Sequence, residues 1–155
     1  MFHDIIVHVL SGTDNTVWPF YGPVKGMLMS FGYALKKFRE DRDLSLRELG
    51  KLCEIDHAYI HRLEKDEKTA PSDEVVASFI RYLKLTPRRA QLLKLLVGKT
   101  VHEQLIDVFI EDEDRDLELL VPAYQMSFRG KRPESKDEWR KHIDRLAKFL
   151  NEDEG

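Results

Sequence analysis

Residues 44–71 read LSLRELGKLCEIDHAYIHRLEKDEKTAP, and this stretch decides the fold. Its apolar residues recur at the spacing of helical turns, which predicts one helix over residues 46–53 and a second over residues 57–65. The predicted inward stripe of the first helix consists of Leu46, Leu49 and Leu52, with Gly50 and Cys53 beside it. Helices this short are unstable alone, so the pattern requires neighbouring helices that pack against them.

Helix-start signals recur along the chain. Ser45 with Glu48 forms the S-x-x-E pattern of a capping box, and Asp56 is suited to cap the second helix. Further caps are expected at Ser72, at Thr86 followed by Pro87, and at Ser135. Together with the apolar spacing, they predict additional helices over residues 31–41, 75–83, 88–97 and 136–150. We therefore expect an all-α fold.

The most specific part of the pattern is YIHRLE at residues 59–64, followed by a basic loop that ends at Pro71. Other positions that share the pattern are Leu44, Ser45, Glu48, Leu49 and Ile55. With them the stretch resembles the helix-turn-helix of the lambda repressor and Cro-like proteins, the Xre family. The resemblance covers about residues 31–96. It implies a five-helix lambda-repressor-like DNA-binding bundle.

Four positions depart from that family's pattern. Leu46 stands where the family usually has a glutamine that hydrogen-bonds a DNA phosphate, which a leucine side chain cannot do. Gly50 replaces the usual alanine, at a cost of about 1 kcal/mol in helix propensity. Glu54 replaces the glycine of the turn, so we expect a residue with a side chain in the left-handed conformation. Asp66 replaces the glycine that follows Glu64.

The resemblance implies that the helix beginning at Asp56 enters the major groove of double-stranded DNA. By position, the base-reading residues are His57, Ala58 and Arg62. Contacts with the DNA backbone are assigned to His61, Arg47, Lys65 and Lys68. Arg62 is suited to a bidentate pair with a guanine edge, worth about 1–3 kcal/mol of discrimination, and Ala58 to a thymine methyl. The alternative for Arg62 is an ion pair with Glu64 or another acidic neighbour.

The 155 residues divide into three predicted parts. Residues 1–29 form an irregular N-terminal arm, with a short strand at IIVHVL, or are upstream sequence attached by a mis-called start. Residues 30–98 are the helix-turn-helix domain. Residues 99–155 are a helical extension for dimerisation or for a protein partner.

Charge is distributed unevenly between these parts, although the net charge is only −3. Residues 75–102 contain six Lys and Arg residues and no acidic residue, which is either a solvated face or a DNA contact. From residue 103 onward, nine Lys and Arg residues stand against fifteen Asp and Glu residues. In that extension, one predicted helix face contains Val101, Leu105, Val108 and Phe109. The acidic run at residues 111–116 reads as a solvated turn.

Several classes of protein are disfavoured. The single cysteine, Cys53, excludes a disulfide framework and fits a cytoplasmic protein. No apolar run reaches membrane-spanning length. No Gly-rich phosphate loop or nucleophile elbow appears, so we expect neither an enzyme nor a cofactor. His57 and His61, with Glu64 as a third donor, have metal-ligand spacing, but such pairs often arise by chance, and no metal is expected.

Two functional hypotheses follow. The first is a sequence-specific DNA-binding transcriptional regulator, a repressor of the Cro type, that acts as a homodimer. The second is an antitoxin or another interaction module that binds a protein partner, such as a toxin, through the C-terminal extension.

Overall fold

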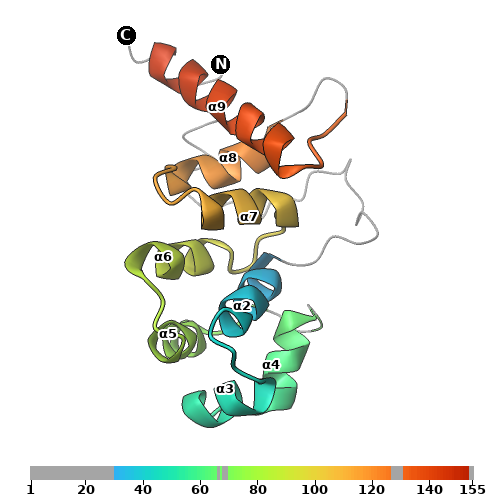
Figure 1. Cartoon of the computed structure of the whole chain (residues 1–155), viewed down its shortest axis with the longest axis vertical. Coiled ribbons are helices and arrows are strands. Elements are labelled where there is room, and N and C mark those ends of the chain that lie inside the picture. The colour runs from blue at the N-terminus through green and yellow to red at the C-terminus, as the bar shows by residue number, and fades with distance from the viewer. Residues whose placement is uncertain (1–29, 66, 68–69, 127–130, 154–155) are drawn as a thin grey trace.

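The computed structural model describes residues 30–65, 67, 70–126 and 131–153, and within them it contains helices and no strand (Figure 1). The helices are α2 (Ser30–Glu40), α3 (Leu46–Cys53), α4 (His57–Glu64), α5 (Asp73–Tyr82), α6 (Pro87–Leu95), α7 (Glu103–Glu111), the 3-10 helix η1 (Leu117–Leu119), α8 (Leu120–Gln125) and α9 (Lys136–Asp153). The all-α prediction is confirmed. The predicted N-terminal arm and its strand lie outside the described residues.

Capping side chains fix where the helices of the bundle begin. Ser45 and Glu48 form the predicted capping box: the Glu48 amide donates to Ser45 Oγ at 3.2 Å, and the Ser45 amide donates to Glu48 Oε2 at 2.7 Å. Asp56 Oδ1 accepts from a backbone amide of α4 at 2.8 Å. Ser72 and Thr86 do the same for α5 and α6. Each cap satisfies an amide that the helix itself leaves unpaired.

The core of the bundle corrects one detail of the predicted stripe on α3. Leu49 and Cys53 are buried, whereas Leu52 is 43% exposed. At 100° per residue, positions 46, 49, 50 and 53 lie within about 100° of one another, and position 52 lies about 110° from their centre. Leu52 therefore points away from the core, and Gly50 takes the inward place.

Helix α7 lies between the bundle and the C-terminal helices (Figure 1). The sequence predicts one apolar face, but every residue from 105 to 110 is buried. Contacts with α2 on one side and with α8 and α9 on the other explain this burial. Buried apolar residues form one cluster that runs from α2 to α9. The domain boundary at residue 98 stays a prediction, and the core is continuous across it.

A polar contact inside this junction joins α7 to α2. Asp107 is only 7% exposed. One of its carboxylate oxygens accepts a hydrogen bond from the Tyr33 hydroxyl at 2.9 Å and a second from the Lys37 ammonium. Burial raises the pKa of Tyr33, and the bond to Asp107 raises it further. The buried carboxylate is therefore paired, as a charge at such a site must be.

The acidic run at residues 111–116 is more than the solvated turn that the sequence predicts. Arg140 of α9 donates to Glu111 at 2.7 Å and to Asp112 at 3.1 Å, and Lys136 donates to Glu111 at 2.6 Å. The bond from Lys136 lowers the pKa of Glu111. The start of this run thus holds α9 against the end of α7.

Candidate nucleic-acid interface

The turn between α3 and α4 sets the position of α4. Glu54 adopts the expected left-handed conformation, with φ 56° and ψ 36°, and the amide of Ile55 donates to Gly50 O at 2.9 Å. A side chain at Gly50 would place its Cβ 2.7 Å from Ile55 O and 3.3 Å from the amide nitrogen of His57. Only glycine therefore lets the first residues of α4 approach α3 this closely.

A buried ion pair holds the other end of α4. Arg39 of α2 donates from Nε and Nη2 to the two carboxylate oxygens of Glu64, at 2.7 and 2.9 Å. Its third nitrogen, Nη1, donates to Leu44 O at 2.7 Å. The bond to Glu64 raises the pKa of Arg39. Glu64 therefore has a structural role. The alternative predicted from the sequence, an ion pair between Arg62 and Glu64, is not formed.

The outward face of α4 carries the predicted DNA-binding side chains. Ile60 and Leu63 are buried, and this orientation turns the opposite side of the helix to the surface. The exposed residues there are His57, Ala58, His61, Arg62 and Lys65. Among the described residues, Arg62 makes no ion pair. Lys68 lies outside the described residues.

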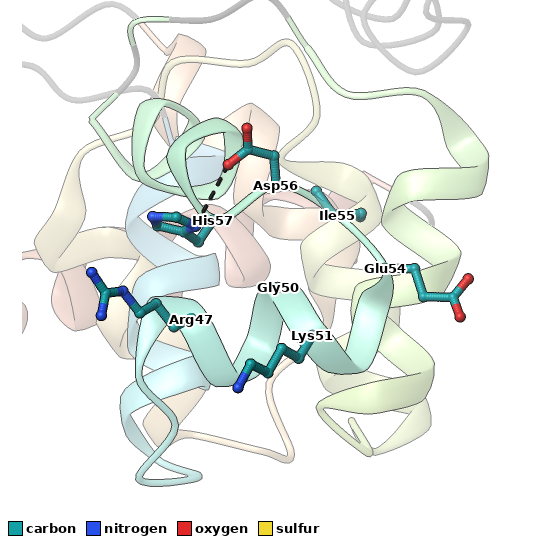
Figure 2. A pocket seen from close by; sticks show the side chains of 7 residues that line it. All are labelled: Arg47, Gly50, Lys51, Glu54, Ile55, Asp56 and His57. Carbon is teal, nitrogen blue, oxygen red and sulfur yellow. Dashed lines mark ion pairs between the residues drawn. The ribbon is translucent and has the colours of Figure 1, made fainter.

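Arg47 lies on α3, near the start of α4. It lines a shallow hollow of about 350 Å³ at the corner between the two helices (Figure 2). The residues around this hollow are Arg47, Gly50, Lys51, Glu54, Ile55, Asp56 and His57. Lys51 was not among the DNA-binding residues predicted from the sequence. It stands four residues after Arg47, on the same helix face, and this spacing could have predicted it.

The basic segment at residues 81–99 is partly occupied by structural contacts. Arg89 donates to Asp41 at 2.9 Å, and its guanidinium lies over the Phe38 ring. Arg88 donates to the carbonyl oxygen of Asp112 at 3.0 Å, at the end of α7. Two of the six cations therefore join helices. The exposed cations of the segment are Arg81, Lys84, Lys94 and Lys99.

Three further observations on the described part of the chain concern metal ligands, the thiol and membrane spans. No group of three His, Cys, Asp or Glu residues there is arranged to hold a metal ion, and Glu64, the third donor beside His57 and His61, is bound by Arg39. Burial raises the pKa of the Cys53 thiol. No described helix has both the length and the apolar character to cross a membrane.

Residues 30–93, from α2 into α6, match the family model of a helix-turn-helix domain. A search of curated proteins found no match for the chain. A helix-turn-helix domain indicates DNA binding and a role in transcription regulation.

Proposed function

We propose that this protein is a sequence-specific DNA-binding transcriptional regulator, a repressor of the Xre type, that places α4 in the major groove of double-stranded DNA. The observation that carries the proposal is the pairing of Arg39 with Glu64. This pair fixes α4 from inside and leaves the Arg62 guanidinium exposed without an acidic partner among the described residues. A helix held in this way can present rigid donors to base edges.

The roles on α4 follow from the chemistry of each side chain. Arg62 would donate two hydrogen bonds to a guanine edge, and Ala58 would contact a thymine methyl. His57, at the first turn, would donate to a base edge or a phosphate. Contacts with the DNA backbone would come from His61, Lys65, Lys68 and Arg47.

Reading an operator with one short helix gives few base contacts, so we propose a homodimer. In helix-turn-helix proteins, two copies read half-sites separated by about 34–36 Å, one turn of DNA. The extension after residue 98 would provide the dimer contact. A repressor of this kind would act in the cytoplasm by occupying its own promoter.

Fluorescence anisotropy tests the proposal with the full chain and two duplexes, DNA from its own promoter and a scrambled version, at two salt concentrations. We expect tighter binding to the promoter and a steep loss of affinity as salt rises. Arg62→Ala should cost about 1–3 kcal/mol on the promoter duplex and far less on the scrambled one. Arg42→Ala is the matched control, because Arg42 is an exposed arginine in the turn after α2, outside the residues assigned to DNA and outside the extension. Equal losses on both duplexes would contradict base reading by Arg62.

A second candidate is an antitoxin, in which the C-terminal helices bind a protein partner such as a toxin. The observation that favours it is that two large apolar side chains of the extension are exposed, Phe149 at 49% and Met126 at 41%. Co-purification with the product of a neighbouring small reading frame would support it. Loss of that complex in Phe149→Ser, with DNA binding unchanged, would assign the contact to α9.

A further inference from the structure

Two cations, Arg47 and Lys51, stand at the corner between α3 and α4, and the proposed function gives a role only to Arg47. Arg47 and Lys51 stand four residues apart on α3, so their side chains reach the same face of that helix. Both line the hollow at the corner, with His57 at its rim (Figure 2). The described structure gives neither cation an ion-pair partner.

The carboxylates that the structure describes around this corner form no ion pair with the two cations. Glu48 accepts from the Ser45 amide at 2.7 Å, and Asp56 caps α4 through the Ala58 amide at 2.8 Å. Glu54 points away from Arg47 and Lys51 (Figure 2). Arg47 and Lys51 are both exposed, so their charged groups are open to a ligand on the side where α4 begins.

We propose that Arg47 and Lys51 together bind one phosphate of the DNA backbone at this corner. The inference rests on the proposed function and deepens it by adding Lys51 to the interface. In a helix-turn-helix complex the second helix lies in the major groove and the first crosses the backbone. With α4 in the groove, the exposed cations of α3 beside the corner face a phosphodiester group. Phosphate contacts of this kind set register and orientation and carry no sequence information.

The test uses the full chain and a random-sequence duplex, because a backbone contact needs no operator. Binding is measured by anisotropy across a series of salt concentrations. The double variant Arg47→Ala/Lys51→Ala should weaken binding about eightfold near 0.1 M salt and lower the slope of log K against log salt by about 0.9, the value for one phosphate contact. Lys51→Ala alone should lose part of both. Alanine is a good helix former, so both variants should fold. The promoter-to-random affinity ratio should not change.

Lys36→Ala is the charge-matched control. Lys36 is 53% exposed on α2, outside the residues assigned to DNA and outside the extension proposed for the dimer contact. If Lys51→Ala matches Lys36→Ala while the wild type binds DNA, the phosphate contact is overturned and DNA binding stands. If the wild type binds no duplex, both proposals fall. Selective displacement of DNA by inorganic phosphate at matched ionic strength, lost in Lys51→Ala, would assign the corner to free phosphate and overturn the DNA contact.

Discussion

The two ends of the molecule use their charged side chains in different ways. At the bundle end, the ion pair that holds α4 is buried: the Arg39 and Glu64 side chains are 11% and 5% exposed. At the C-terminal end, the pairs that hold α9 lie at the surface, with Arg140 29% and Glu111 38% exposed. The surface pairs are individually weak, whereas breaking the buried pair leaves a charge without solvent.

This difference decides which cations a ligand can reach. Because α4 is fixed from inside, Arg62 and the cations at the α3 corner are not needed to hold helices together. At the other end Lys136 and Arg140 are already bound to carboxylates of α7 and its C-terminus. A count of basic residues therefore says little about nucleic-acid binding until their partners are known. Three predictions test this comparison, from the largest expected effect to the smallest.

Removing the buried carboxylate should have the largest effect. Glu64→Ala leaves the Arg39 guanidinium buried without its partner, so we expect the free energy of unfolding to fall by about 3–5 kcal/mol. Chemical denaturation at neutral pH measures this loss. Glu67→Ala, which removes an exposed carboxylate just beyond α4, should change stability by less than about 0.5 kcal/mol. Equal effects of the two substitutions would contradict a buried anchor for α4.

Gly50→Ala tests the close approach of α4 to α3. Helix propensity alone would make alanine more stable by about 1 kcal/mol. The backbone carbonyl 2.7 Å from the new Cβ cannot move without shifting the turn, and such overpacking costs about 1–3 kcal/mol. We therefore expect a net loss of up to about 2 kcal/mol in thermal or chemical unfolding.

Ala77→Gly, at an exposed position of α5, is the control for Gly50→Ala because it reports propensity without a clash. It should lose about 1 kcal/mol. If Gly50→Ala instead gains that amount, the corner does not depend on glycine.

The local features of the bundle were predictable because local rules produce them. The capping box at Ser45 and the cap at Asp56 follow from residues within a few positions of one another. The left-handed Glu54 was expected because it stands where the family that the stretch resembles has a glycine. The inward side of α4 follows from the spacing of Ile60 and Leu63. These features place His57, Ala58, His61 and Arg62 on the surface, and their contacts with DNA stay predictions.

The remaining features depend on contacts between residues far apart in the chain. Asp107 looks like a polar interruption in an apolar helix, but its partners lie 70 and 74 residues earlier, on α2. Arg62 is available because Arg39 binds Glu64 across 25 residues. Lys51 belongs to the candidate site because it lines a hollow together with Asp56 and His57, at the start of α4. The periodicity of one helix cannot predict partners that lie on other helices.

The smallest effect concerns pH and a half-buried histidine of the C-terminal end. His102 caps α7: its Nδ1 accepts from the Gln104 amide at 3.2 Å, which requires that nitrogen to be unprotonated. Burial lowers the pKa of His102 below the ordinary 6.5. The unfolded chain therefore takes up a proton more readily, and stability should fall as the pH drops below 6.5.

His102→Asn keeps a capping oxygen and removes the titration. Chemical denaturation between about pH 7.5 and 5.5, above the range where carboxylates titrate, should show a shallower loss of stability than in the wild type. Some loss should remain, because burial also lowers the pKa of His142. If His102→Asn loses stability as steeply as the wild type over this range, the acid-sensitive contact is not at the start of α7.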